Sequence, residues 1–502
     1  MPTFDVRACK PGQTPPKEDQ LAWKLAEMAL ADWPEDAAID DMAVNRVIDS
    51  YAVAMAAINR PPVANARAQA VAHPRRGGAT VFGLPNDRLV ACEWGAWANS
   101  CAVRELDFND AFMATESSHP SDNIATLVAV AQQMRRSGAD LIRAVATAYQ
   151  VQCDMCMAME LNTHGIDHTA YLGPAITSGI GAMLKLDADV LYQALQHAVH
   201  VTQTTRQGRK GTMSSWKAYA PGHVGKLCID AVDRAMRGEK GPSPVYEGDF
   251  GIIPMFLDGP DGHYTVTLPD PGQPRGAILN TYPKEYSVGY HGQPIIDLAF
   301  RFRKKIKNPE DIESVDIFSK RSTHLVMGSG SNDPQKYDPN TTRETLDHCA
   351  MYAFAVAFFD GTWHHEKSYL MEARTRPEVL SLWRKTKTHE DEEWNRRYRE
   401  PPALEKDQGS RIEITFKNGE KMVDELAVAD SHPRGARPMK RSDYVRKFKT
   451  LTEDIATSDE AERFLGVAER LAKLSASDLL DLNVVADATE LACVEADNRG
   501  IY

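Results

Sequence analysis

Apolar side chains recur at helical spacing through the first half of the chain. Leu21, Leu25 and Met28 mark one face of a helix that we expect to begin near Thr14-Pro15, a pair typical of helix starts. The segment DNIATLVAVAQQMRRSG keeps a helical period and is predicted to end at Gly138. The same spacing continues in four later segments: DLIRAVATAYQVQCDMCMAMEL, YLGPAITSGIGAML, DADVLYQALQHAVHV and GKLCIDAVDRAMRG.

Three glycines, Gly173, Gly179 and Gly181, lie within one of these predicted helices. Glycine weakens a solvent-exposed helix because its backbone loses more freedom on folding than that of any other residue. In a buried helix, the missing Cβ lets a neighbouring helix approach closely. We therefore interpret these glycines as points of close packing between buried helices.

The pattern changes near residue 242, and strand signals follow Tyr282. ESVDIFSKRS is a predicted strand, and RIEITFKNGEKMVDELAVA alternates around Asn418-Gly419, a strong hairpin signal. Helical spacing returns in SDYVRKFKTL and EAERFLGVAERLAKL. The charge-rich stretch HEDEEWNRRYREPPALEKDQG is predicted to be a solvated connector.

These patterns predict a mainly α protein with an α+β second domain. The expected parts are a large helical domain at 1–275, a smaller α+β domain at 276–439, and C-terminal helices at 440–502 that return to the helical domain. A chain of 502 residues is also too long for one compact core.

Charge and composition narrow the class of protein. The net charge of −12 disfavours nucleic-acid binding. The sequence contains no run of about eighteen apolar residues, so we expect no membrane span. The N-terminal segment lacks a signal-peptide pattern. The scattered cysteines indicate reduced thiols, so we expect a cytoplasmic protein. Cys153 and Cys156 form the one close pair, which we interpret as helix packing because a metal site would need more ligands.

The polar stretch LDFNDAFMATESSHPSDN, residues 106–123, interrupts the apolar region and offers the first candidate chemistry. His119 stands just before a predicted helix, whose free N–H groups and partial positive charge suit a carboxylate ligand. Asp107 and Asp110 could hold a cationic or hydroxylic group. A capped loop rich in Asp and Ser explains the same residues, and the local pattern alone favours that interpretation.

Four other segments carry polar groups that also have a structural interpretation. His168, between a polar turn and a glycine-rich helix, has the setting of a structural histidine. TTRQGRKGTMSSWK is either an anion-binding loop or a basic surface loop. YPKEYSVGYHGQ lies where the helical region ends, a frequent position for a ligand site. KYDPNTTRETLDHCAMY, which contains Asp347 and His348, has the composition of a turn.

The order of these segments is more specific than any one of them. LDFND, SHPSDN, GIDH, RKGTMSSWK, KEY and LDHCAMY follow one another in a sequence that resembles the MmgE/PrpD family from Leu21 to Phe448. The resemblance implies a large helical domain, an α+β lid domain, an active site between them, and a homodimer. It also implies that the protein uses neither a metal nor an organic cofactor.

The resemblance further implies the residues of the site. The implied catalytic residues are Asp107, His119, His168, Lys217 and Lys284. The expected substrate-binding residues are Arg209, Lys210, Tyr286, His291 and Tyr337. At one position the chain departs from the family, which often has threonine after the DFxD motif where this chain has Ala111.

The activity that this resemblance implies is a cofactor-independent dehydration of a tricarboxylate, 2-methylcitrate, to 2-methyl-cis-aconitate in the methylcitrate cycle of propionate catabolism. His119 and His168 are the expected acid–base pair, because imidazole titrates near working pH. A citrate dehydratase, cis-aconitate decarboxylase or epimerase of the family would use nearly the same groups. A non-catalytic helical scaffold would explain the Ala-rich helices but not the imidazole and cationic groups.

Overall fold

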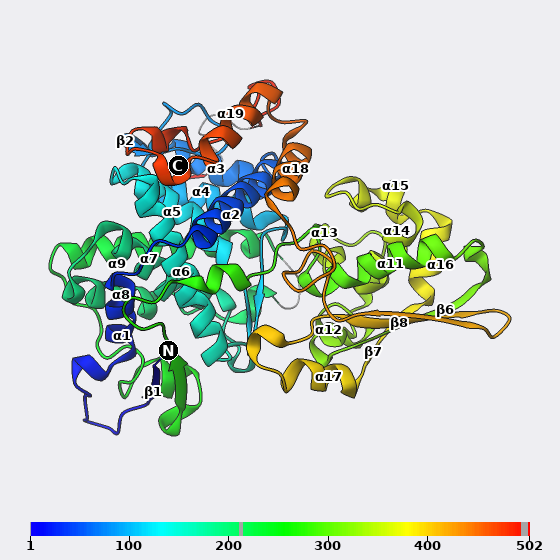
Figure 1. Cartoon of the computed structure of the whole chain (residues 1–502), viewed down its shortest axis with the longest axis horizontal. Coiled ribbons are helices and arrows are strands. Elements are labelled where there is room, and N and C mark those ends of the chain that lie inside the picture. Colours follow the sequence, from blue (N-terminus) through cyan, green and yellow to red (C-terminus); the bar gives the residue numbers. More distant parts are fainter. Residues whose placement is uncertain (1, 210–213, 493–499, 502) are drawn as a thin grey trace. The chain divides into compact units, whose positions relative to one another are not determined.

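The computed structural model describes residues 2–209, 214–492 and 500–501 (Figure 1). The chain divides into two compact units. Unit 1 consists of Met1–Glu105, Asn109–Thr281 and Arg441–Tyr502, and unit 2 consists of Leu106–Phe108 and Tyr282–Lys440. The prediction of a mainly helical protein with an α+β portion is confirmed, because helices dominate the described residues and a four-stranded mixed sheet lies in unit 2.

Unit 1 is a bundle of helices with short strands at its edges. Its helices are α1 (Leu21–Leu30), α2 (Ala37–Ala56), α3 (Pro61–Val71), α4 (Cys92–Glu105), α5 (Ile124–Gln133), α6 (Gly138–Ala158), α7 (Leu172–Leu184), α8 (Ala188–Val201), α9 (Trp216–Met236), α10 (Ile252–Phe256), α18 (Arg441–Thr452) and α19 (Ser458–Ala468). Its strands are β1 (Thr3–Arg7), β2 (Pro74–Ala79), β3 (Phe112–Met113), β4 (Ser117–Ser118) and β5 (His263–Thr267), of which β1 pairs with β5 and β3 with β4.

Two predicted helix ends are wrong. Helix α1 begins at Leu21 rather than near Thr14-Pro15, and its first amide is capped by the Oε1 atom of Glu247, 2.7 Å away. That cap comes from a distant part of the chain, so no local signal marks it. Gly138 does not end α5 but begins α6, whose capping box is formed by Ser137 and Asp140.

The glycines of α7 pack against neighbouring helices, as the sequence predicts. A Cβ atom on Gly179 would lie 2.9 Å from the carbonyl oxygen of Ala144 in α6 and 3.0 Å from a methyl group of Leu127 in α5. Helix α6, which carries Cys153 and Cys156, therefore packs with its backbone directly against α7 at Gly179. Both cysteines are buried free thiols in α6, which confirms that they lie in a helix.

Unit 2 is an α+β module around a four-stranded sheet. Its helices are α11 (Gln293–Lys305), α12 (Arg321–Val326), α13 (Arg343–Leu346), α14 (Ala350–Asp360), α15 (Met371–Arg374), α16 (Pro377–Lys385) and α17 (Glu392–Arg399). Its strands are β6 (Ile312–Ser319), β7 (Thr386–Glu390), β8 (Ser410–Phe416) and β9 (Lys421–Leu426), in the order β7-β6-β8-β9. Strand β7 is parallel to β6, and the other pairs are antiparallel.

The hairpin at Asn418-Gly419 is confirmed, since β8 and β9 pair on either side of it and Gly419 has a φ of +86°. The predicted solvated connector is wrong. It contains the end of β7 and all of α17, and Trp394 in α17 is buried. The prediction failed because one buried tryptophan in a charged segment is too weak a pattern to reveal a helix, although Asp391 caps it locally.

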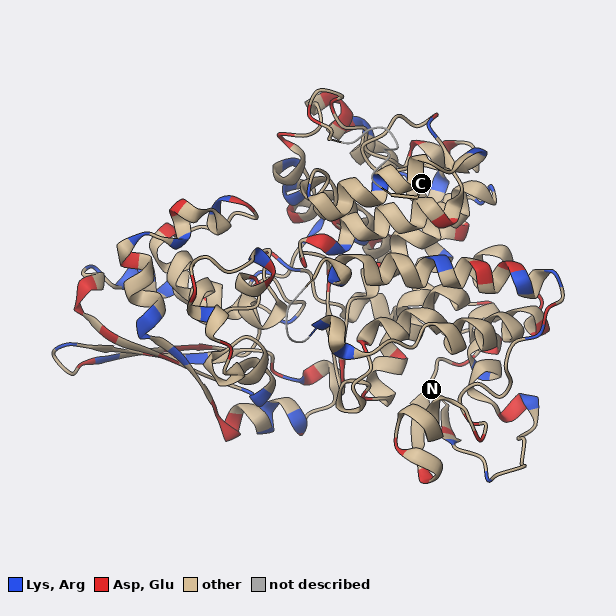
Figure 2. Ribbon diagram, turned by 180° about the vertical axis from the view of Figure 1, so that it is seen from behind, with Lys and Arg blue, Asp and Glu red and all other residues tan. Residues whose placement is uncertain are grey.

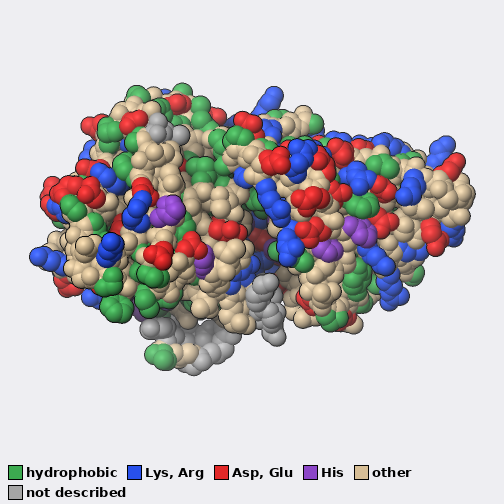
Figure 3. Space-filling view, turned by 90° about the horizontal axis from the view of Figure 1, so that it is seen from below, with side chains coloured by type: hydrophobic (Ala, Val, Ile, Leu, Met, Phe, Trp, Pro, Cys, Tyr) green, Lys and Arg blue, Asp and Glu red, His purple; other side chains and the backbone are tan. Residues whose placement is uncertain are grey.

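The last helices of the chain belong to unit 1. Helix α18 packs on α2, where Arg46 donates to the Tyr444 hydroxyl and Lys447 forms a buried ion pair of 2.7 Å with Asp49. Acidic and basic residues are interspersed along the ribbon of Figure 2, and their side chains are interspersed over the face seen in Figure 3. Each helix among the described residues is too short or too polar to cross a membrane.

Gly179→Ala should destabilise the protein by about 1–3 kcal/mol, because a well-packed core pays that much for an extra methyl group. Gly466 in α19 provides the matched control, since a Cβ atom there would meet nothing within 4 Å. Gly466→Ala should stabilise the protein by up to about 1 kcal/mol through helix propensity. Chemical denaturation of both variants tests this, and equal effects of the two substitutions would contradict close packing at Gly179.

Candidate active site

The polar stretch at residues 106–123 is an internally bonded structure and not a solvated loop. Asp110 is buried and accepts hydrogen bonds from the Ser121 amide and the Tyr149 hydroxyl, both at 2.9 Å. The Nε atom of Arg46 lies 3.5 Å from the same carboxylate. Burial raises the pKa of Asp122 to about 7, although Arg104 lies 3.8 Å away and lowers it.

His119 is held by this structure at a defined ring nitrogen. Its Nδ1 atom lies 2.7 Å from the carbonyl oxygen of Asp110, which can only accept, so Nδ1 carries the proton. In the neutral ring Nε2 is then the nitrogen that can accept a proton. The centre of the ring lies 5.4 Å from that of His168, so the structure brings together the two histidines expected to act as a pair.

His168 lies among cations and one carboxylate. Its Nδ1 atom is 3.6 Å from the carboxylate of Asp167. Arg209 donates hydrogen bonds of 2.7 and 3.3 Å to the same carboxylate. Burial lowers the pKa of His168 to about 3, and the Arg209 guanidinium adds to the shift. Its Nε2 atom is buried and makes no hydrogen bond to the residues that the structure describes.

Asp167 completes this arrangement as an anion. Burial alone would raise the pKa of its carboxyl group, but His168 and Arg209 lower it well below its ordinary value. Arg209 is therefore bound to a protein carboxylate in this structure. Lys217 is buried in the first turn of α9, and its carbonyl oxygen accepts from Arg209 at 3.4 Å. Lys210 lies outside the described residues.

Unit 2 holds the other two expected catalytic residues. The buried ammonium group of Lys284 donates to the Oδ1 atom of Asp107 at 2.9 Å and to its carbonyl oxygen at 2.6 Å. Asp107 has a φ of +50°, a left-handed conformation that aspartate tolerates better than most residues. Lys284 thus fixes both the charge and the backbone of Asp107.

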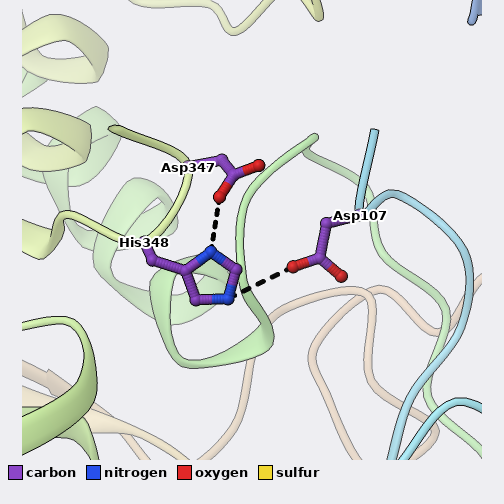
Figure 4. A group of neighbouring side chains, drawn as sticks. All are labelled: Asp107, Asp347 and His348. Atoms are coloured by element: carbon purple, nitrogen blue, oxygen red, sulfur yellow. Dashed lines mark hydrogen bonds and ion pairs between the residues drawn. The ribbon is translucent and has the colours of Figure 1, made fainter. Parts of the chain in front are cut away.

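A histidine that sequence reasoning did not select joins this pair (Figure 4). The Nε2 atom of His348 lies 3.2 Å from the Oδ2 atom of Asp107, and its Nδ1 atom makes a short hydrogen bond with Asp347. The second oxygen of Asp347 accepts from Arg343 at 3.1 Å. Asp347 and His348 were noted in a segment with the composition of a turn, and only their contact with Asp107 reveals their position.

Asp107, Asp347 and His348 also have the residue types of a metal site, and their ligand atoms lie within 4.8 Å of one another. All four carboxylate oxygens, however, already face nitrogen donors of Lys284, His348 or Arg343. A metal ion would have to displace these donors, one of which is the permanently cationic guanidinium of Arg343. The geometry fits a chain of charge-assisted hydrogen bonds better than a metal centre.

The remaining expected substrate contacts are spread through unit 2. Tyr286 is buried in the apolar core, where its hydroxyl donates to Asp297 at 2.8 Å. Tyr337 packs on the same core and donates to the Thr386 carbonyl at 3.1 Å. His291 lies 3.1 Å from the Thr323 hydroxyl; burial lowers its pKa well below the ordinary value, with a further contribution from Lys320. Both tyrosines have structural partners, so we give them no role in the chemistry proposed below.

The lowered pKa of His168 predicts a specific pH dependence of stability. Below an ordinary histidine pKa of about 6.5 the unfolded chain binds a proton that the folded protein does not, so acid destabilises the fold. Between pH 7.5 and 5.0 the wild type should lose about 2 kcal/mol of unfolding free energy relative to His168→Gln.

Denaturant titrations of both proteins at the two pH values measure this loss. A comparison between pH 7.5 and 9.0, where histidine is neutral in both states, is the control and should show no relative change. A constant difference between the two proteins from pH 7.5 to 5.0 would contradict a neutral, buried His168.

Comparison with known proteins places both units in one family. The MmgE/PrpD N-terminal domain matches residues 19–265, and the MmgE/PrpD C-terminal domain matches residues 286–473. The 2-methylcitrate dehydratase of Salmonella typhi is 25% identical over 77% of this chain and 81% of its own. A mitochondrial 2-methylcitrate dehydratase of Yarrowia lipolytica is 24% identical over 78% of this chain and 76% of its own.

A third relative carries a different name. The alkylcitrate dehydratase phiI of a fungus is 26% identical over 66% of this chain and 68% of its own. At these identities the comparisons support the family more firmly than any particular substrate. From the matches to both of its domains, the chain belongs to the MmgE/PrpD family.

Proposed function

We propose that this protein is a dehydratase that converts 2-methylcitrate to 2-methyl-cis-aconitate without a metal or an organic cofactor. The observation that carries the proposal is the pair of imidazoles His119 and His168, 5.4 Å apart and surrounded by arginines. Elimination of water needs one group to accept a proton from carbon and another to protonate the leaving hydroxyl. The relatives named 2-methylcitrate dehydratase support the choice of substrate.

His168 is the proposed base. A neutral imidazole can accept a proton, and the lowered pKa of His168 keeps it neutral at pH 7. A pKa of about 3 would make it a weak base in the resting protein. A bound tricarboxylate would bring negative charge close to the ring, and nearby anions raise the pKa of a histidine. The substrate would thus restore the basicity that its own reaction requires.

The proton to be removed lies beside a carboxylate and is only weakly acidic. Its removal places negative charge on carboxylate oxygen, so fixed cations must stabilise the transition state. Arg206 and Arg209 supply positive charge near His168, and Lys217 is buried in the first turn of α9 in the same unit. Burial lowers the pKa of the Arg206 guanidinium, which is the direction expected for a cation that lacks enough anionic partners.

His119→Gln should lower kcat on 2-methylcitrate by about 10²–10⁴, the usual contribution of positioned proton transfer, and should change KM much less. Glutamine keeps a polar side chain but cannot exchange a proton near neutral pH. The assay follows the absorbance of the conjugated product. His200→Gln at the exposed end of α8 is the matched control and should retain full activity.

Two outcomes of this assay would count against the proposal. Near-normal kcat in His119→Gln, with an unchanged pH profile, would remove His119 from the chemistry. A wild-type protein that leaves 2-methylcitrate unchanged would reject the function itself. Parallel assays with citrate and with longer alkylcitrates determine the substrate, because the fungal relative is named for alkylcitrate.

Activity should survive dialysis against EDTA. The candidate metal ligands Asp107, Asp347 and His348 already bond to one another or to Lys284 and Arg343, which leaves their oxygens committed to nitrogen donors. Activity measured before dialysis, after dialysis and after addition of divalent metal ions provides the test. Loss on dialysis with recovery on metal addition would show that the proposed mechanism lacks an essential ion.

A further inference from the structure

We infer that Arg206 binds one carboxylate group of the substrate, beside the histidine pair of unit 1. The inference rests on the proposed function and deepens it, because it assigns a particular contact to one of the two arginines near His168. Arg206 is not one of the site residues that the family resemblance implies. Its side chain is half-buried and forms neither a hydrogen bond nor an ion pair with the residues that the structure describes.

The backbone places Arg206 beside the segment that carries His168. The amide of Asp167 donates to the carbonyl oxygen of Thr204 at 2.8 Å, and the amide of Arg206 donates to the carbonyl oxygen of Gly165 at 2.7 Å. These two hydrogen bonds tie the two segments together as an antiparallel bridge. The position of Arg206 is therefore fixed relative to the histidine on the neighbouring segment.

The local helical geometry determines the side from which Arg206 extends. Arg206 and Arg209 are the first and last residues of one 3-10 turn. In such a turn, side chains three residues apart lie one above the other. Arg209 extends to the carboxylate of Asp167, which precedes His168 in the chain. Arg206 leaves the turn on the same side, toward the segment of His168.

The two arginines differ in what they bind. Arg209 donates to both carboxylate oxygens of Asp167, at 2.7 and 3.3 Å, and to the carbonyl oxygen of Lys217 at 3.4 Å. Its donors are committed to the protein, and its charge is matched by Asp167. Arg206 has no such partner among the described side chains, so its guanidinium is the one of the two that can take a ligand.

The other acid whose charge acts on Arg206 is also occupied. Glu116 accepts hydrogen bonds from the amides of Ser117 and Asn162, at 2.9 and 2.8 Å. Burial lowers the pKa of the Arg206 guanidinium, and the attraction of Glu116 only partly opposes that shift. The folded protein thus leaves a buried positive charge without an ion pair in the described chain.

A carboxylate is the ligand that this guanidinium fits. Its N–H donors form a planar fork, which matches the two oxygens of a carboxylate through a pair of parallel hydrogen bonds. A carboxylate also supplies the negative charge that the surroundings of Arg206 lack. In a water-poor site such a charge-assisted pair is stronger than the same pair in water.

His168 offers a second group without a partner on the adjoining segment. Its Nδ1 atom faces Asp167, which leaves Nε2 as the accepting nitrogen of the neutral ring. That Nε2 atom is buried and, like Nε of Arg206, unbonded within the described residues. One ligand can satisfy both: the carboxylate binds Arg206, and the C–H beside that carboxylate faces His168, the proposed base.

This arrangement gives Arg206 a role in the rate as well as in binding. Negative charge builds up on the carboxylate oxygens as the neighbouring C–H loses its proton. A fixed cation on those oxygens binds more strongly in the transition state than in the ground state. Arg206 therefore contributes to kcat/KM at least as much as it contributes to the affinity for a carboxylate that does not react.

The test measures the Kd of tricarballylate, a tricarboxylate with no hydroxyl to eliminate, by titration calorimetry. Arg136→Gln is the matched control for Arg206→Gln. Arg136 is likewise half-buried with a buried, unbonded Nε atom, but it follows the C-terminal end of α5, whereas His119 precedes the N-terminal end. Arg206→Gln should raise the Kd by about 10- to 100-fold, as expected for a lost charged hydrogen bond, and Arg136→Gln should leave it unchanged.

Two further measurements separate a binding role from a structural one. Because Arg206 bonds to no described side chain, Arg206→Gln should unfold at the same denaturant concentration as the wild type. Arg206→Lys keeps the charge but not the fork, so its Kd should lie between those of the wild type and Arg206→Gln. It also replaces Arg206→Gln in the titration if that variant does not fold. On 2-methylcitrate, kcat/KM of Arg206→Gln should fall by at least the factor by which its Kd rises.

Failure of the contact and failure of the proposed function give different results. A wild type that binds tricarballylate, loses affinity in Arg206→Gln and leaves 2-methylcitrate unchanged would reject the dehydration and retain the contact. A wild type that dehydrates 2-methylcitrate, with equal Kd and equal kcat/KM in Arg206→Gln, would reject the contact alone. Absence of tricarballylate binding to the wild type, or an equal rise of Kd in Arg136→Gln, would also overturn it.

Discussion

A carboxylate that is removed from water must be paired or hydrogen-bonded. The polar stretch at residues 106–123 contains three buried aspartates to which this applies. Asp107 is bonded to Lys284, and Asp110 to Tyr149 with Arg46 nearby. Asp122 lies beside Arg104 and accepts from Asn109. Arg46, Arg104 and Tyr149 lie in three different helices, α2, α4 and α6, so this stretch can adopt its structure only when those helices are in place. Loss of any single partner would leave a carboxylate without its partner in a low-dielectric surrounding, which would strongly destabilise the fold.

The same requirement gives two histidines of the protein opposite electrostatic surroundings. His168 lies near Arg209, Arg104 and Arg206, and burial together with these cations keeps it neutral. His348 lies between two carboxylates, with Nε2 3.2 Å from Asp107 and Nδ1 hydrogen-bonded to Asp347. Surroundings of opposite charge are a means by which one residue type can take different roles. The difference follows from the neighbours of each ring and not from the histidines themselves.

Sequence patterns predicted the parts of the structure that depend on local periodicity. The glycine-containing helix α7 and the Asn418-Gly419 hairpin are examples, since spacing and turn chemistry are readable along the chain. Features that depend on distant partners were missed: the Glu247 cap of α1 and the position of His348. In the site, the ordered motifs selected His119 and His168, which do lie together. They did not reveal that Lys284 is buried against Asp107, because a lysine in a polar segment gives no sign of its partner.

Fixed protein charges can replace a metal ion only if they are already in place before the substrate binds, because reorganising them would consume the binding energy that should lower the barrier. The alternating chain of Arg343, Asp347, His348, Asp107 and Lys284 meets this condition, since the four residues other than His348 are buried and bonded in the resting protein. The cost of burying those charges is offset within the chain by opposite neighbours. The two carboxylates are thereby held in place by fixed cations, Lys284 and Arg343, before any ligand binds.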